Sequence, residues 1–190
     1  MKYLFVFLLV GLMVSCGDAS GDASENVKPK LKEYSYDEVT KPNDILLLKK
    51  NMKPVTGIVK GNYEDGKLEY EGNYKDGKYD GLHRYWYEDG QLREESNCKD
   101  GKKDGLWRYW YEDGQLREEG NWKDDKLDGL QRTWYENGQI NKELHYQDGK
   151  LDGLARKYYE NGQMKTEANF KDGELISEKC WDKDGNRIKC

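Results

Sequence analysis

The sequence has few of the residues that build reaction centres. It contains two histidines, His83 and His145, and four cysteines in 190 residues. The histidines occupy different positions of the repeat described below and have no recurring partner, so we interpret both as structural or surface residues. No metal-ligand or triad spacing is present, and no nucleophile or acid–base pair stands apart from the repeat. The sequence therefore predicts a non-enzyme without metal or cofactor.

Long hydrophobic runs and helical periodicity are also scarce. The longest apolar run, residues 3–14, is too short for a membrane span, which needs about 20 residues. No segment shows a sustained apolar stripe at 3.6-residue spacing, which argues against helices. Charged residues make up 36% of the chain, the net charge is −5, and no basic patch occurs. This charge pattern disfavours nucleic-acid binding.

The first residues have the order of a secretory signal: Lys2, then the apolar run, then a small residue before a cysteine. Met13-Val14-Ser15-Cys16 resembles the lipobox of bacterial lipoproteins, a family in which the signal is cut before the cysteine and the cysteine carries the lipid. The resemblance implies a lipoprotein signal peptide at 1–15 and a lipid anchor on Cys16. It places the protein in the bacterial cell envelope, on the inner or outer membrane. An ordinary signal peptide cut nearby is the alternative.

The segment after Cys16 changes composition abruptly. Residues 17–20 recur as 21–24, and a polar stretch follows. Such a segment buries too little apolar surface to order itself. We expect residues 16–43 to be the lipidated cysteine and a flexible tether, whose reach is roughly 25 Å for about 20 residues.

A unit of 24 residues recurs about five times in the rest of the chain. The copy at 111–134 begins Tyr-Glu-Asp-Gly-Gln, and the same phrase starts at Tyr63, Tyr87, Tyr135 and Tyr159 with one substitution in some copies. Glycines recur in step with it, at 66, 90, 114, 138 and 162 and at 57, 81, 105, 129 and 153. A fixed period in this range indicates a repeat architecture.

Each unit holds two strands and two turns. Glu-Asp-Gly or Glu-Asn-Gly between strand residues favours a hairpin, because glycine supplies a positive φ. Lys-Asp-Gly-Lys-x-Asp-Gly is expected to be the second, longer turn, and the aromatic runs between the turns suit strands. The predicted fold is all-β: an elongated single-layer antiparallel meander of 24-residue β-hairpin repeats, roughly 12 strands, over residues 44–181. Residues 182–190 are expected to form a closing turn and strand.

Apolar and charged residues recur in columns at the repeat period. Two apolar columns begin at Leu82 and Trp86, and Arg84 and Glu95 begin a pair of charged columns. Whether each arginine lies directly opposite its glutamate depends on the turn. A two-residue turn would align them, whereas a three-residue turn with a bulge would shift the register by one residue.

The units resemble the MORN repeats in their bacterial variant form. Tyr70-Glu71-Gly72-Asn73-Tyr74 matches that family's Tyr-x-Gly-x-Trp/Tyr, and Tyr-Glu-Asn-Gly-Gln followed by Lys-Asp-Gly-Lys resembles the YwqK-type antitoxins. The resemblance covers residues 45–185. It implies a single-layer sheet of hairpins that makes protein or membrane contacts and has no catalytic residues.

The remaining cysteines lie near the end of the chain or in the repeat. Cys180 and Cys190 flank the last turn, and the oxidising compartment of an exported protein favours a disulfide between them, with two free thiols as the alternative. Cys98 occupies an aromatic column and is expected to be a buried thiol. Asp182-Lys183-Asp184-Gly185-Asn186 resembles the start of a calcium loop, but the chain ends before the glutamate that such a loop requires.

These observations favour a non-catalytic, lipid-anchored repeat scaffold that binds a protein or envelope component. A glycan-binding envelope module and an antitoxin-like inhibitor of a partner protein are the alternatives. The expected partners are an unknown protein or envelope component and the membrane, through the anchor on Cys16, with no nucleic acid. We expect binding through a face of the sheet, with Tyr85, Trp107 and Tyr109 as candidate residues, because so thin a sheet has no interior for a ligand.

Overall fold

The computed structural model describes residues 30–190. The predicted signal peptide, Cys16 and the first part of the predicted tether lie outside the described residues. Within the described part, no helix has the length and apolar character needed to cross a membrane.

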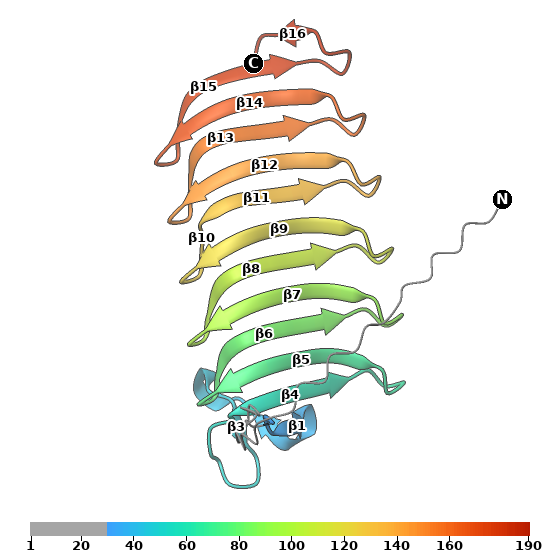
Figure 1. Cartoon of the computed structure of the whole chain (residues 1–190), viewed down its shortest axis with the longest axis vertical. Helices are drawn as coiled ribbons and strands as arrows, with labels where there is room; N and C mark the ends of the chain where they lie inside the picture. Colours follow the sequence, from blue (N-terminus) through green and yellow to red (C-terminus); the bar gives the residue numbers. More distant parts are fainter. Residues whose placement is uncertain (1–29) are drawn as a thin grey trace, which may run out of the picture. The chain divides into compact units, whose positions relative to one another are not determined.

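One long sheet contains nearly all the repeats (Figure 1). Its strands are β1 (Glu33–Ser35), β4 (Gly57–Asn62), β5 (Leu68–Lys75), β6 (Lys78–Trp86), β7 (Leu92–Lys99), β8 (Lys102–Trp110), β9 (Leu116–Lys123), β10 (Lys126–Leu127), β11 (Gly129–Trp134), β12 (Ile140–Gln147), β13 (Lys150–Tyr158), β14 (Met164–Lys171), β15 (Glu174–Trp181) and β16 (Arg187–Ile188). From β4 onward the strands pair antiparallel in chain order, while β1 joins β4 in parallel and β10 pairs only with β9. The predicted all-β, single-layer, mostly antiparallel fold is confirmed, with 14 strands in the sheet instead of about 12.

Two kinds of loop alternate along the sheet. Lys99 and Lys102 are cross-strand partners, so only Asp100 and Gly101 connect them, and both have positive φ angles of 50° and 91°. Positive φ at both central residues defines the type I′ turn that suits a twisted hairpin. The Lys-Asp-Gly-Lys motif is therefore a two-residue hairpin turn, and the expectation that it is the longer of the two turns was wrong.

The Tyr-Glu-Asp-Gly-Gln phrase forms the longer loop at the opposite edge. The amide of Tyr87 donates to the carbonyl of Gln91 at 2.8 Å, and the amide of Gly90 donates to the carbonyl of Tyr87 at 2.9 Å. A β-bulge shifts the strand register between Tyr85 and Trp86, just before this loop. With this bulge, Arg84 pairs directly with Glu95 although the loop has five residues, which settles the register that the sequence left open.

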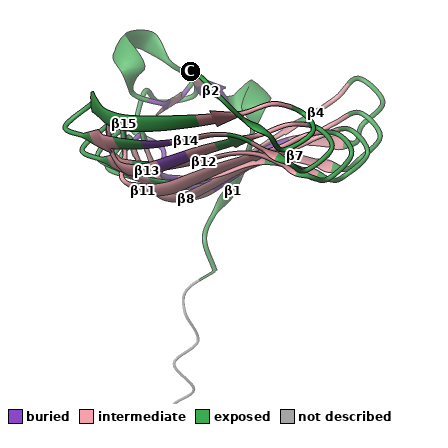
Figure 2. Cartoon of the chain, turned by 90° about the horizontal axis from the view of Figure 1, so that it is seen from above, coloured by how far each residue is buried: buried purple, intermediate pink, exposed green. Residues whose placement is uncertain are grey.

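The segment before the repeats folds onto the first of them. Residues 31–56, here called the N-terminal cap, contain β1, η1 (Tyr36–Glu38), β2 (Val39–Thr40), η2 (Pro42–Asp44) and β3 (Leu47–Leu48). Strands β2 and β3 pair as a small second sheet on one side of the long one (Figure 2). Val39, Leu46 and Val55 are buried in one cluster with Val59 and with tyrosines of β5.

The boundary that we expected at residue 44 therefore lies too late in the chain. The first strand begins at Glu33. The segment is ordered because Val39 is buried in the core cluster, and its polar neighbours in the sequence do not indicate this. Strand β3 is limited to Leu47–Leu48, and Ile45 just before it is exposed.

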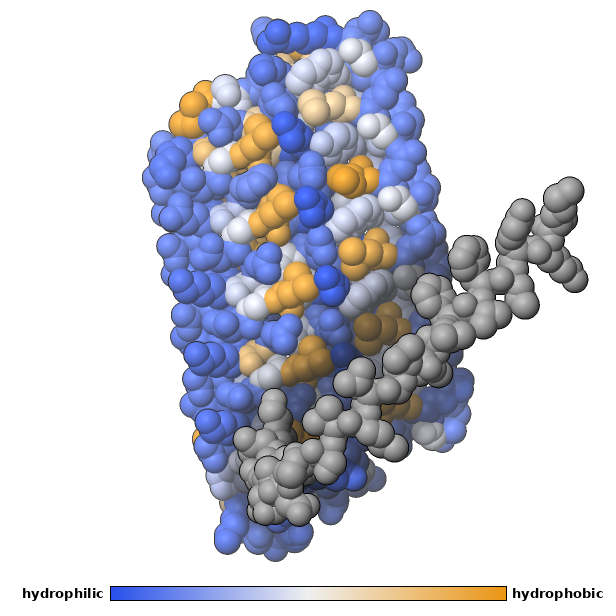
Figure 3. All heavy atoms as spheres, in the orientation of Figure 1, coloured by the Kyte–Doolittle hydropathy of each residue, from blue (hydrophilic) through white to orange (hydrophobic). Residues whose placement is uncertain are grey.

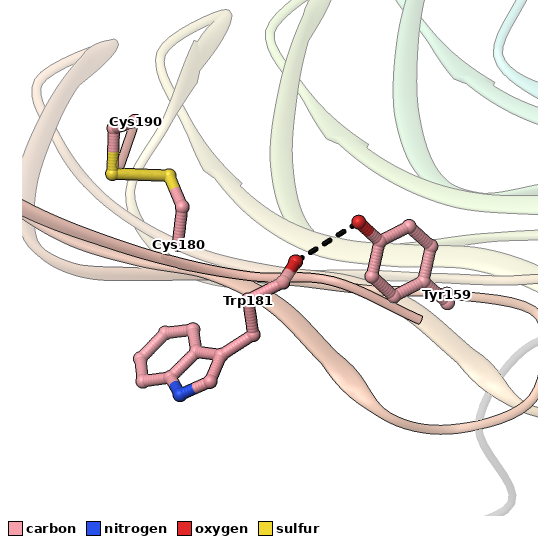
Figure 4. Close-up of a disulfide and its surroundings, with 4 residues drawn as sticks. All are labelled: Tyr159, Cys180, Trp181 and Cys190. Atoms are coloured by element: carbon pink, nitrogen blue, oxygen red, sulfur yellow. Dashed lines mark hydrogen bonds between the residues drawn. A yellow bond between two sulfur atoms is a disulfide. The ribbon is translucent and has the colours of Figure 1, made fainter. Parts of the chain in front are cut away.

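At the other end of the sheet, β15 and β16 close the repeats. Cys180 and Cys190 are joined by a disulfide, with their Cα atoms 5.3 Å apart (Figure 4). Cys180 is also the cross-strand partner of Ile188. The outermost strands, β1 and β16, are two or three residues long. β16 pairs with β15 only at Cys180 and Trp181, so residues 174–179 of β15 form an open edge of the sheet.

Candidate binding face and groove

The two faces of the sheet differ in how regularly their residue types recur from repeat to repeat. Successive side chains of a strand point to opposite faces, so Arg84 and Trp86 share one face, and His83 and Tyr85 share the other. Tyr85 packs against the cluster beneath the cap. We call the face of Arg84 and Trp86 the ladder face and the face of His83 and Tyr85 the cap-side face.

The ladder face repeats itself from unit to unit. Its columns on alternate strands are Leu82, Leu106, Leu130 and Leu154; Arg84, Arg108, Arg132 and Arg156; and Trp86, Trp110, Trp134 and Tyr158. Figure 3 shows a surface of this kind, with hydrophobic residues in columns along the sheet and hydrophilic residues between them. Across adjacent strands these residues face partners of other types, with Arg84 opposite Glu95 and Trp86 opposite Leu92, and the same pairs recur in the next repeat. Such cross-strand pairs hold the repeats together.

Arginines and glutamates form a zigzag along the ladder face. Arg132 lies 3.1 Å from Glu143 and 3.4 Å from Glu119, and Arg108 lies 3.6 Å from Glu119 and 3.9 Å from Glu95. The hydrogen bond that Arg132 donates to the Glu143 carboxylate raises the pKa of its guanidinium. Because these side chains are partly exposed, each pair contributes only about 0–1 kcal/mol. The zigzag therefore specifies register more than it adds stability.

The first tyrosine of each long loop connects neighbouring repeats. Its hydroxyl donates a hydrogen bond to a backbone carbonyl about one repeat further along the chain. The pairs are Tyr63 to Trp86, Tyr87 to Trp110, Tyr111 to Trp134, Tyr135 to Tyr158 and Tyr159 to Trp181 (the last in Figure 4), at 2.5–2.9 Å. Sequence reasoning missed this role, although the constant spacing between the tyrosine and the following Trp column was a signal for it.

His145 has a structural role that follows from its position in the repeat, which asparagine occupies in other copies. Asn73 and Asn97 donate from their side-chain amides to the carbonyls of Leu82 and Leu106, at 2.6 Å and 3.1 Å. His145 stands at the equivalent position, and its Nδ1 donates to the carbonyl of Leu154 at 2.8 Å. The imidazole thus replaces the asparagine amide.

His83 belongs to a buried network on the cap-side face. It is 2% exposed; its Nε2 donates to the Asn73 carbonyl at 2.9 Å, and its Nδ1 accepts from the Tyr70 hydroxyl at 3.1 Å. The Tyr70 hydroxyl lies 2.8 Å from that of Tyr74. Burial lowers the pKa of His83 to about 4 and raises the pKa of both tyrosines well above the ordinary value. The imidazole is therefore neutral at pH 7, and we assign the network a structural role.

The cap-side face changes from repeat to repeat, unlike the ladder face. Its equivalent positions on β6, β8, β11 and β13 read His83, Trp107, Gln131 and Ala155, and Tyr85, Tyr109, Thr133 and Lys157. On β5, β7, β9, β12 and β14 they read Gly72, Ser96, Gly120, Leu144 and Ala168. The sheet itself does not require one residue type at these positions.

The three candidate residues lie on the cap-side face but in different surroundings. Trp107 and Tyr109 have ring centroids 6.2 Å apart, and Trp107 Nε1 donates to Glu94 at 2.9 Å. Tyr85 instead packs on Tyr70, with centroids 4.7 Å apart, and supports the cluster beneath the cap. Tyr85 thus has a stabilising role that the sequence did not indicate.

A groove follows the long-loop edge of the cap-side face. It begins as a cavity of about 620 Å³ between the cap and the sheet, with six tyrosines in its lining: Tyr36, Tyr63, Tyr70, Tyr74, Tyr79 and Tyr85. Two further hollows of about 620 Å³ and 640 Å³ lie against the loops of the next repeats. The expectation that the thin sheet offers a face and no pocket was wrong, because the cap forms a second wall over the first repeat.

The remaining reactive groups have structural explanations. Burial raises the pKa of the half-buried Cys98 thiol. Glu178 lies close to Cys180 and Cys190, but those sulfurs form the disulfide. In the calcium-like stretch, Asp182 Oδ1 accepts hydrogen bonds from the amides of Asn186 and Asp184, at 2.9 Å and 3.0 Å. That carboxylate therefore closes the last turn.

Comparison with known proteins identifies the repeat. A family model described as MORN repeat variant matches residues 55–76, 79–100, 103–124, 127–148 and 151–172. No curated protein matches the chain. MORN repeats are in general non-catalytic modules that bind proteins or lipids.

Two solved structures share a slight likeness with the chain. Both are of TarM, one of them an S. aureus mutant in complex with fondaparinux, alpha-GlcNAc-glycerol and UDP. They are 14% identical to this chain with TM-scores of 0.32, and the matches cover 50% and 54% of it. The chain spans 19% and 20% of the length of the TarM chains, and at this TM-score the likeness supports no argument about fold or function.

Proposed function

Because this chain belongs to the MORN repeat variant family, we propose that it is a non-catalytic scaffold that binds a partner protein of the cell envelope through its cap-side face. Five matched repeats cover more than half of the chain. A protein partner is favoured over a lipid surface because the chain carries a net charge of −5, whereas the membrane surfaces that attract proteins by charge are anionic.

The observation that carries this proposal is the difference between the two faces. The ladder face has the same residue types in nearly every repeat, and its contacts join the strands. The cap-side face keeps aromatic residues only at particular repeats, such as Trp107 and Tyr109 on β8. Tryptophan, tyrosine and arginine dominate binding hot spots. Because Trp107 and Tyr109 occur together in one repeat only, they would direct a partner to that repeat of an otherwise regular sheet.

We propose that the scaffold is held at the membrane by a lipid on Cys16. The support is the sequence Met13-Val14-Ser15-Cys16 after an apolar run. Replacing Cys16 by alanine is expected to release the protein from the membrane fraction or to leave it unprocessed. Membrane retention of a correctly cleaved Cys16→Ala protein would contradict the anchor.

Capture from envelope extract tests the binding face. Wild-type protein is compared with a Trp107→Ala/Tyr109→Ala variant, and bound proteins are quantified by mass spectrometry. The matched control is Trp110→Ala on the ladder face of the same strand. We expect one partner to be lost with the first variant while its melting temperature changes little, and Trp110→Ala to lower the melting temperature more than it lowers capture.

Two results would contradict the proposed function. In one, no captured protein depends on Trp107 or Tyr109. In the other, soluble cell-wall fragments quench the tryptophan fluorescence of the wild type and compete with all capture, which would favour the glycan-binding alternative.

A further inference from the structure

The three hollows of the groove are adjacent. The cavity under the cap shares Tyr63 and Glu69 with the next hollow, and that hollow shares Tyr87 and Glu112 with the third. Tyr111 stands in the third hollow. The groove therefore passes three consecutive repeats, with one tyrosine between each hollow and the next.

The tyrosine walls are held in place before any ligand binds. The hydroxyls of Tyr63, Tyr87 and Tyr111 each donate to a backbone carbonyl of the following repeat. Each ring is therefore fixed at its distal end and lines the groove. Fixed side chains lose little conformational entropy on binding, which favours affinity.

The walls recur at a distance that suits one backbone conformation. Consecutive tyrosines are two strands apart, which is roughly 9.6 Å at about 4.8 Å per strand. A polyproline II helix has three residues per turn and advances about 9.3 Å per turn, so every third residue would meet an equivalent hollow. Side chains on one face of a β-strand recur at about 6.8 Å, and an α-helix has a pitch of about 5.4 Å. Neither spacing matches the walls.

The groove also has an excess of negative charge. The hollow between Tyr63 and Tyr87 is lined by four carboxylates, Glu69, Glu88, Asp89 and Glu112, and by one arginine, Arg93. The next hollow has Glu112, Asp113 and Glu136 against Arg117. Within the described residues, none of these carboxylates is in an ion pair.

The rings of the groove already accept cationic groups. The guanidinium of Arg93 lies 5.4 Å and 6.0 Å from the ring centroids of Tyr85 and Tyr87. Arg117 lies 5.2 Å from Tyr109 and 5.6 Å from Tyr111 in the same way. A basic side chain of a partner would find aromatic faces and unpaired carboxylates in each hollow.

We propose that the groove binds an extended, basic, proline-containing segment of a partner protein, in the polyproline II conformation with Lys or Arg at every third residue. Aromatic-lined grooves are a known recognition mode for this conformation, because it is extended before binding. Three hollows accommodate about nine residues. This inference rests on the proposed function, since it describes the chemistry of a partner that approaches the cap-side face.

A peptide of four Lys-Pro-Pro triplets, titrated against the full chain by calorimetry, tests the inference. We expect saturable binding that weakens as ionic strength rises. A peptide of Lys-Gly-Gly triplets has the same charge and spacing without the preformed conformation, and a Lys-Pro dipeptide repeat has the wrong period. Each is expected to bind at least about tenfold more weakly, which corresponds to about 1.4 kcal/mol.

Paired variants locate the binding site. Glu88→Gln/Glu112→Gln removes two carboxylates of the groove and is expected to weaken binding of the Lys-Pro-Pro peptide about tenfold. Glu64→Gln/Glu160→Gln makes the same change at the equivalent loop positions outside the three hollows. That matched control is expected to bind like the wild type, and both variants should fold because all four side chains are exposed.

Equal binding of the Lys-Gly-Gly and Lys-Pro-Pro peptides would overturn the inference, and so would equal weakening by the two double variants. Either result would show that the peptide binds only through non-specific electrostatic attraction to the acidic surface. A partner that is captured through Trp107 and Tyr109 but is not displaced by the Lys-Pro-Pro peptide would keep the proposed function and overturn this inference alone.

Discussion

The hydroxyl of Tyr111 donates a hydrogen bond of 2.8 Å to the backbone carbonyl of Trp134, which lies 23 residues further along the chain. The same bond recurs at the other long loops, so the loop edge of the sheet is tied together one repeat at a time. These bonds add to the strand-to-strand ladder and join each loop to its successor. They give the repeats an interface beyond side-chain stacking, and interfaces between neighbours are a principal source of stability in repeat proteins.

Replacing Tyr111 by phenylalanine should measure one of these bonds. The ring remains and only the hydroxyl is lost, so we expect the free energy of unfolding to fall by about 0.5–1.5 kcal/mol in urea denaturation. Tyr36→Phe is the control, because Tyr36 is 62% exposed. Equal midpoints for wild type and Tyr111→Phe would show that the bond contributes no net stability.

Gly77 should be the glycine on which docking of the cap depends. It donates its amide to the Val55 carbonyl and accepts from the Leu46 amide, both at 2.8 Å. A Cβ there would lie 2.4 Å from Cγ2 of Ile45, whereas a Cβ at Gly90 would meet nothing within 4 Å. Both glycines have positive φ, 78° and 92°, so alanine brings similar backbone strain of roughly 1–3 kcal/mol at each.

We therefore expect Gly77→Ala to destabilise the protein more than Gly90→Ala. Its particular signature should be faster hydrogen exchange at the Leu46 amide, since that amide is bonded to the Gly77 carbonyl. Unchanged protection of Leu46 in Gly77→Ala would show that the cap does not depend on this contact.

His83 should make stability depend on pH. Its pKa in the folded protein is about 4, below the ordinary 6.5, because burial disfavours the charged imidazole. The unfolded chain therefore binds more protons between these values, and stability rises with pH across this range. The stabilisation is fully present above pH 6.5 and is lost as pH falls toward 4, by roughly 3 kcal/mol at most.

A His83→Gln variant isolates this effect, because the carboxylates titrate in both proteins. Urea denaturation between pH 4 and pH 7 is expected to give a smaller loss of stability for His83→Gln than for the wild type. Parallel pH profiles for the two proteins would show that the imidazole does not stay neutral in the folded state.

The disulfide between Cys180 and Cys190 should stabilise the closing strand. The two cysteines are 10 residues apart, so the loop is short and the chain-entropy model limits the gain to about 3 kcal/mol. Mass spectrometry of the non-reduced C-terminal peptide from envelope-isolated protein should find it lighter by two hydrogen atoms. Two alkylatable thiols in that peptide would contradict the bond.

Reduction of the bridge should act locally. Because β16 pairs only with β15, we expect faster hydrogen exchange in β16 after reduction, with the strands of the central repeats unchanged.

The sequence by itself determined the repeating part of this protein. Asp-Gly between strand residues predicts a turn, because aspartate tolerates and glycine favours positive φ, as at Asp100 and Gly101. The pair does not fix the length of the turn, since Asp89 and Gly90 lie in a five-residue loop. Alternation then places Arg84 and Tyr85 on opposite faces. These properties are local or periodic, so they can be read directly from a chain that repeats the same phrase every 24 residues.

Only the tertiary structure decided what happens at the first repeat. Val55 accepts the Gly77 amide as Tyr79 accepts that of Gly101 one repeat later, but at the first repeat the Gly77 carbonyl also accepts from Leu46 of the cap. A Cβ at Gly72 would collide with the Tyr70 hydroxyl and with His83, although the equivalent position is serine in the next repeat. The cap and the cavity beneath it depend on contacts between an aperiodic segment, residues 31–56, and the first repeat. No local preference or period encodes such contacts, because they exist only after the chain has packed.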